Sequence, residues 1–309
     1  MTRVSATRVE AGEAGGFDVH SIVASKAGPR IVVLGGVHGD ETEGALAAGR
    51  LVASPPALVR GQLDVVPVTH EAAFATDSRT SPIDGVNLAR VFPGDPNGGP
   101  TARLAHHLYD SVLADADLLI DLHTSGSHYD MPFLAGYRGE PGGGVTDRAR
   151  AAHAFGADFV WRHPGRSEGR TVSVVENAIY AECPGGGSTD LAMVDAYHRG
   201  VLNVLAEFHF TDSEVAVRKR PAILVTGGGN LDRDMISIAH DGVFLTPLAR
   251  GDTVDTGQMI GTVIDNLGRQ LATIHAGTAG RVMALKRRSK VSKGDLVVCI
   301  AAEDDASPL

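Results

Sequence analysis

Cysteine, long apolar runs and basic charge are all scarce in this sequence. Its two cysteines, Cys183 and Cys299, are too few for a disulfide framework, which favours a reduced, cytoplasmic environment. No uninterrupted apolar stretch approaches the roughly 20 residues that a membrane helix needs. The N-terminus also lacks the apolar segment of a secretory signal. We therefore expect a cytoplasmic protein with no membrane partner.

Acidic residues outnumber basic residues by 37 to 28, which gives a formal net charge of −9. Nucleic-acid-binding proteins usually carry a basic stripe, so we expect no nucleic-acid partner. Apolar residues make up 43% of the chain and charged residues 21%, which is ordinary globular usage and excludes wholesale disorder. A length of 309 residues corresponds to about two domains.

Strand-like and helix-like runs alternate over the first two thirds of the chain. Apolar runs predict buried strands at 31–34, 63–68, 118–122 and 178–183, and helical spacing predicts helices over 42–53, 102–113 and 188–208. This alternation predicts an α/β domain over residues 1–215, with a mixed, mostly parallel sheet flanked by helices. Ligands of such sheets bind at the carboxyl ends of the strands.

From Pro221 onward, glycine and β-branched residues dominate, and segments 242–264 and 280–300 resemble each other. This repetition predicts a small all-β domain over residues 216–309, built from two similar halves. Its pattern resembles the barrel-sandwich hybrid of biotinyl and lipoyl carrier domains, which present a modified lysine at a hairpin tip. Residues 265–269, at the corresponding place, contain no lysine, so a structural or site-covering role is favoured over a carrier role.

The strongest chemical pattern follows the first predicted strand. His38 and Glu41 lie three residues apart at a turn that opens a helix, so both side chains can face one point beyond the strand end. Imidazole and carboxylate both suit Zn²⁺, and His123, at the end of another strand, supplies a third ligand. Three protein ligands leave one position open, as in catalytic zinc sites. Asp121 shares a strand face with His123 and is expected to orient an imidazole.

Hydrolysis at such a site also needs a proton acceptor that is not a metal ligand. Glu182 is the candidate, because it ends a predicted strand just before a glycine-rich loop. Arg79 and Arg90 lie in a segment rich in turn residues, where one could polarise a scissile carbonyl and the other hold a substrate carboxylate. Asn87, in the same segment, either caps a turn or contacts the substrate.

In chain order the candidates form one set of motifs: His38-x-x-Glu41, Arg79, Asn87-Leu-Ala-Arg90-x-Phe-Pro-Gly, Asp121-Leu-His123 and Glu182-x-x-Gly-Gly. This set resembles the succinylglutamate desuccinylase/aspartoacylase family, a branch of the zinc-carboxypeptidase fold, over nearly the whole chain. The Gly-Asp-Glu form of the first motif and the glycine-rich stretch after Glu182 are most similar to N-acetyl-diaminobutyrate deacetylase-like members.

The resemblance implies one Zn²⁺ per chain, held by His38, Glu41 and His123 in a zinc-carboxypeptidase-like α/β domain. It implies that Glu182 is the general base for a metal-activated water and then protonates the leaving amine. It also implies that Arg79 polarises the scissile carbonyl, while Arg90 holds a substrate carboxylate.

Two positions depart from the family pattern. Ala89 stands where the family usually has the second Asn of Asn-Leu-Asn-Arg, so we expect carboxylate recognition to be altered. Aspartoacylases also bring a tyrosine from the C-terminal domain to the substrate, whereas this chain has no tyrosine after Tyr197. His240 is a candidate replacement. Both departures concern the substrate more than the reaction.

The sequence therefore predicts a zinc-dependent amidohydrolase that acts on a small N-acylated amino acid. The alternative within enzymes is a metallocarboxypeptidase that cleaves a C-terminal peptide bond; the extra β domain favours the small substrate, because it can exclude a polypeptide. The alternative outside enzymes is a non-catalytic metal- or ligand-binding protein of the same fold, which the intact Glu182 argues against. A homo-oligomer remains open.

Overall fold

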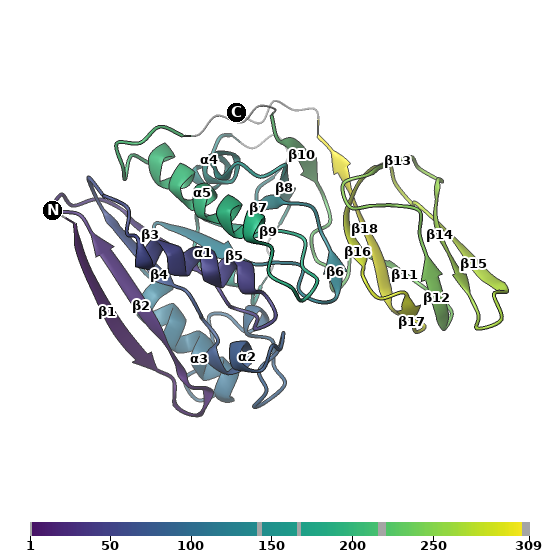
Figure 1. Ribbon diagram of the computed structural model, residues 1–309, viewed down its shortest axis with the longest axis horizontal. Coiled ribbons are helices and arrows are strands. Elements are labelled where there is room, and N and C mark those ends of the chain that lie inside the picture. Colours follow the sequence, from purple (N-terminus) through teal and green to yellow (C-terminus); the bar gives the residue numbers. More distant parts are fainter. Residues whose placement is uncertain (1, 141–143, 166–167, 216–220, 305–309) are drawn as a thin grey trace.

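The computed structural model describes residues 2–140, 144–165, 168–215 and 221–304. An α/β part, which contains the N-terminus, lies beside a part built from strands alone (Figure 1). The boundary expected between residues 215 and 216 falls at the edge of segment 216–220, which is outside the described residues. Among the described residues, no helix is long and apolar enough to cross a membrane.

One mixed sheet forms the centre of the α/β part. Its strands are β1 (Arg3–Glu10), β2 (Gly16–Val23), β3 (Arg30–Leu34), β4 (Gln62–Val66), β5 (Leu118–Leu122), β7 (Leu134–Arg138), β8 (Phe159–His163) and β9 (Ala178–Glu182). They are ordered β1-β2-β4-β3-β5-β9-β7-β8. The neighbours β4, β3, β5 and β9 run parallel, whereas β1, β2 and β7 introduce antiparallel pairs. The parallel centre therefore brings the carboxyl ends of β3, β5 and β9 to one edge.

Helices cover both faces of this sheet (Figure 1). They are α1 (Thr42–Ala53), α2 (Glu71–Ala75), α3 (Pro100–Leu108), α4 (Asp147–Phe155) and α5 (Leu191–Glu207), with single turns η1 (Gly12–Ala14), η2 (Leu88–Arg90), η3 (Tyr109–Leu113) and η4 (Thr171–Ser173). Helices α1, α4 and α5 share one buried cluster that includes Leu51, Phe155 and Val201. Helix α3 buries Leu104 and Leu108 in a second cluster, on the other face.

The remaining strands follow residue 220, except for a short one in the α/β part. They are β6 (Tyr129–Asp130), β10 (Ile223–Thr226), β11 (Ile236–Ser237), β12 (Gly242–Leu245), β13 (Thr253–Val254), β14 (Met259–Ile264), β15 (Gln270–His275), β16 (Gly280–Lys286), β17 (Lys290–Val291) and β18 (Leu296–Glu303). Strand β10 pairs with β8, and β18 pairs with β10, so the main sheet continues into the C-terminal part. A separate antiparallel sheet has the order β15-β14-β12-β17.

The α/β prediction is confirmed, with small differences at the helix ends. The helix predicted over 42–53 is α1. The helix predicted over 188–208 begins later, at Leu191, because the side chain of Asp190 accepts a hydrogen bond from the Ala192 N–H and caps it. The helix predicted over 102–113 starts at Pro100 and changes to a π turn at Tyr109. The continuation of the main sheet into the C-terminal part was not predicted.

Candidate metal centre

The close approach of α1 to β5 brings the first two candidate ligands to the third. His38 and Glu41 lie in the connection between β3 and α1, and His123 directly follows β5. Gly44, in the first turn of α1, packs against the end of β5 so closely that a Cβ there would lie 2.3 Å from the carbonyl oxygen of Leu122. Any larger residue would push the helix away from the strand.

We therefore expect Gly44→Ala to destabilise the protein by about 1–3 kcal/mol, as overpacking usually does, and to weaken metal binding. Thermal unfolding and the zinc-to-protein ratio after equilibration measure the two effects. Gly49→Ala is the matched control, because a Cβ at Gly49, in the same helix, meets nothing within 4 Å. Equal zinc retention by both variants would show that the approach of α1 to β5 is not required.

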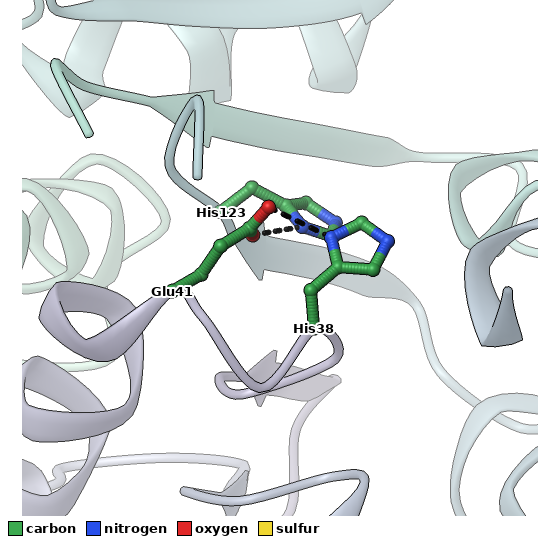
Figure 2. Close-up of side chains that lie close together, drawn as sticks. All are labelled: His38, Glu41 and His123. Carbon is green, nitrogen blue, oxygen red and sulfur yellow. Dashed lines mark hydrogen bonds and ion pairs between the residues drawn. The ribbon is translucent and has the colours of Figure 1, made fainter. Parts of the chain in front are cut away.

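The three candidate ligands form one buried cluster (Figure 2). Glu41 lies between the two imidazoles: its Oε1 is 2.8 Å from His38 Nδ1, and its Oε2 is 2.8 Å from His123 Nδ1. One donor atom from each residue lies within 4.8 Å of the others. Two nitrogens and a carboxylate oxygen are the donor types that Zn²⁺ takes in catalytic sites. The cluster therefore fits a single divalent metal ion.

The second ring nitrogen of each imidazole, Nε2, contacts a polar side chain outside the cluster. His123 Nε2 lies 3.0 Å from Asp121 Oδ2, and His38 Nε2 lies 3.0 Å from Asn87 Oδ1. Such contacts fix the ring orientation and the tautomer of metal-binding histidines. Asn87 Oδ1 also accepts a hydrogen bond from the Ala89 N–H and so caps the turn η2.

The electrostatics of the cluster follow from burial and mutual contact. Burial alone would raise the pKa of Glu41, but the two imidazoles outweigh it and hold this pKa well below the usual range. Burial lowers the pKa of His38. Burial would also lower the pKa of His123, but the carboxylates of Asp121 and Glu41 raise it well above its usual value. An ionised carboxylate is thus available to a cation at the centre.

A cavity of about 500 Å³ opens over this cluster. Its lining includes the imidazoles of His38 and His123, the three candidate polar side chains Arg79, Arg90 and Glu182, and Ala89. Asn87 is not among the described lining residues. A volume of this size is typical of small-molecule sites. The neighbouring parallel strands β3, β5 and β9 thus bring most of the candidates to one space.

Glu182 has one buried carboxyl oxygen that lacks a partner among the described residues, and its pKa is raised. It is the last residue of β9, and its Oε2 is buried with no hydrogen-bond partner among the described residues. Burial, and then the negative charge of Glu41, raise the pKa of Glu182 well above its ordinary value. A carboxyl group of this kind in a cleft is a candidate for proton transfer.

The two candidate arginines have different partners. Arg79 Nη1 lies 3.0 Å from Glu41 Oε1 and 3.3 Å from His38 Nδ1, so its guanidinium adjoins the cluster. Arg90, which lines the cavity, donates from Nε to Asp232 Oδ2 over 2.9 Å. The structure therefore places Arg79 beside the candidate ligands and Arg90 beside the carboxylate of Asp232.

Several polar residues that line the cavity were not among the predicted site residues, including His163, Tyr180 and Asp232. Tyr180 hydrogen-bonds His163 Nε2. Because Tyr180 stands two residues before Glu182 on β9, the strand alternation could have revealed it. No local spacing indicates His163 or Asp232 as site residues. His240, the candidate replacement for a family tyrosine, is exposed and is not among the described lining residues.

Together, the fold and the site define a class: an α/β protein with a buried His-Glu-His cluster beneath a small-molecule cavity. The model of the succinylglutamate desuccinylase/aspartoacylase catalytic domain matches residues 27–208, and the chain belongs to this family. The resemblance that the motifs carried is thereby confirmed.

Relatives and solved structures agree with this assignment. The N-alpha-acetyl-L-2,4-diaminobutyric acid deacetylase of Halomonas elongata is 29% identical over 296 residues, which cover 91% of this chain and 84% of that protein. A succinylglutamate desuccinylase/aspartoacylase from Rhodobacter sphaeroides has a TM-score of 0.84 and 26% identity, over 98% of this chain and 96% of that one. The product-bound ectoine utilization protein EutE (DoeB) from Ruegeria pomeroyi has a TM-score of 0.83 and 26% identity, over 98% and 95%.

Proposed function

We propose that this protein is a zinc-dependent amidohydrolase that removes the acyl group from an N-acylated amino acid or a similar small metabolite. The observation that carries the proposal is the shared cavity, which is lined by His38 and His123 of the candidate ligand cluster and by Glu182, whose Oε2 has no hydrogen-bond partner among the described residues. Membership of a family whose relatives are named as deacetylase and desuccinylase supports hydrolysis of an amide bond.

One Zn²⁺ per chain would be held by His38, Glu41 and His123. Both imidazoles turn Nδ1 toward the carboxylate, while Asn87 and Asp121 engage Nε2, so each ring has one nitrogen directed at the centre. A zinc ion at such a site acts as a Lewis acid that polarises a carbonyl and lowers the pKa of water.

Glu182 and Arg79 would carry out the proton transfer and the charge stabilisation. Glu182 takes the proton of the attacking water on its free oxygen and then passes it to the leaving amine. Arg79 donates hydrogen bonds to the acyl oxygen as negative charge develops there. Its position beside the cluster supports this role.

Arg90 would bind the carboxylate of the substrate. Asn87 is also proposed to contact the substrate, although its Oδ1 is already engaged by His38 and by the Ala89 N–H. The methyl group of Ala89 lines the cavity where the family motif usually has an amide, so Arg90 works with less help.

The all-β region favours a small substrate over a polypeptide. Residues 228–234, which follow β10, line the cavity, so the C-terminal part forms part of its wall. We propose a division into a zinc-carboxypeptidase-like domain over 1–215 and a barrel-sandwich-like domain over 216–309. A cytoplasmic location, without nucleic-acid or membrane partners, remains a prediction.

The function is tested by amine release from the zinc-loaded protein across N-acetyl, N-succinyl and longer N-acyl amino acids, with C-terminal dipeptides alongside. We expect turnover of one N-acyl class, which also identifies the acyl group that the cavity accepts. Hydrolysis of the dipeptides alone would favour a carboxypeptidase, and silence on every compound would contradict the proposal.

A further inference from the structure

The carboxylate of Asp232 lies beside Arg90, which is proposed to bind the substrate carboxylate, and near a second cationic side chain, that of Arg170. Asp232 Oδ2 accepts a hydrogen bond from Arg90 Nε over 2.9 Å and lies 3.6 Å from Arg170 Nη2. All three residues line the cavity. The side chain of Asp232 is 62% exposed, so a ligand can reach it.

The loop that carries Asp232 is anchored to the rest of the cavity wall. Trp161 Nε1 donates to the carbonyl oxygen of Gly227 over 2.8 Å. Asn230 Oδ1 accepts hydrogen bonds from Arg170 Nη2 over 2.9 Å and from the Asp232 N–H over 3.1 Å. One amide oxygen thus fixes the arginine and the backbone of Asp232 together, and the carboxylate keeps a defined place at the cavity.

The charges at this end of the cavity favour an ionised Asp232. Its partial burial would raise its pKa, but the hydrogen bond from Arg90 and the positive charges of Arg90 and Arg170 outweigh this and lower it. Burial lowers the pKa of Arg170, with the charge of Arg90 as a further cause. The side chains of Arg90, Arg170 and Asp232 therefore form a group of two cations and one anion in the cavity wall.

We propose that Asp232 is a specificity-determining residue, which favours N-acyl amino acids with a cationic side chain over those with a second carboxylate. The inference rests on the proposed function. A substrate carboxylate at Arg90 and Arg170 lies beside Asp232, where a substrate cation gains an ionic partner. A second carboxylate meets like-charge repulsion there.

The test compares three N-acetyl amino acids whose side chains are cationic, neutral and anionic: Nα-acetylornithine, N-acetylglutamine and N-acetylglutamate. At low ionic strength, the wild type is expected to have its lowest KM for the cationic compound. Asp232→Asn should reduce the ratio of the anionic KM to the cationic KM by about five- to tenfold, the effect of one charge near a surface.

Two further variants separate this role from a structural one. Asp232→Glu keeps the charge and should keep the preference for the cationic compound. Asp195→Asn removes a similar surface carboxylate, paired with Arg50 on helices away from the cavity, and should leave the three KM values unchanged. An unchanged KM ratio in Asp232→Asn would overturn the proposal.

Calorimetry with free ornithine, glutamine and glutamate makes the test independent of catalysis. The wild type should bind ornithine more tightly than glutamate, and Asp232→Asn should reduce that difference. If no N-acyl compound is hydrolysed but this pattern holds, the deacylase function fails while the role of Asp232 stands. If hydrolysis occurs and Asp232→Asn changes neither the binding nor the KM ratio, the role of Asp232 fails alone.

Discussion

Replacing Glu182 by Gln is expected to reduce amide hydrolysis by about 10²- to 10⁴-fold, the usual contribution of a general base. Gln has nearly the same size but cannot take a proton from water. Glu182 Oε2 has no hydrogen-bond partner in the described protein, so the substitution disrupts no internal contact of that oxygen. The steady-state rate of amine release measures the effect.

The zinc content of the variant distinguishes a lost base from a lost metal. Glu182 is outside the cluster of candidate ligands, so Glu182→Gln should bind as much zinc as the wild type. Glu176→Gln is the matched control, because Glu176 is an exposed acid paired with Arg148 away from the cavity. A Glu182→Gln variant with full activity would remove Glu182 from the mechanism.

The same substitution should stabilise the metal-free protein at neutral pH. The pKa of Glu182 in the folded state lies above its value in the unfolded chain, about 4.3 for Glu, so ionisation destabilises the fold. This penalty is absent below the unfolded pKa and grows as the pH rises toward the folded pKa. The Tm of Glu182→Gln should therefore exceed that of the wild type at pH 7, and the two should converge near pH 4.

Replacing Glu41 by Gln is expected to remove the metal and, with it, the activity. Glu41 is the only carboxylate in the cluster and contacts both imidazoles, through Oε1 and Oε2. An amide supplies no negative charge to a divalent cation. Zinc affinity should therefore fall by more than the roughly 10- to 100-fold that is typical when a residue hydrogen-bonded to a metal ligand is replaced. Metal analysis after dialysis measures the change.

Two further variants should give a smaller loss of zinc affinity and no loss, respectively. Asp121→Asn weakens the support of His123 without removing a ligand, and should reduce zinc affinity by about 10- to 100-fold. His106→Ala removes a histidine of α3, outside the cluster, and should leave affinity unchanged. Wild-type zinc affinity in Glu41→Gln would place the metal elsewhere in the protein.

The residues near strand ends could be predicted because local pattern and topology agree. Strands β3, β5 and β9 are short apolar runs, and each is followed by polar or glycine-rich residues. Parallel neighbours bring such ends together, so His38, Glu41, His123 and Glu182 could be grouped from the sequence. The chain order of these residues matches the order of the family motifs, which supported the same grouping.

Contacts between distant segments could not be predicted in the same way. Asp232 is 142 residues from Arg90, and no periodicity relates the two. Strand β1 has a largely exposed burial pattern, so no apolar run indicates it. The pairing of β10 with β8 depends on the packing of the whole sheet. The change of composition near Pro221 suggested a separate domain and so gave no indication of this pairing.

Metal-dependent deacylation is tested most directly by amine release from the N-acyl panel, measured with protein that is stripped by a chelator and then titrated with zinc. We expect no turnover by the stripped protein and full recovery at one zinc per chain, because the cluster of His38, Glu41 and His123 fits a single ion. Undiminished turnover by the stripped protein would contradict it.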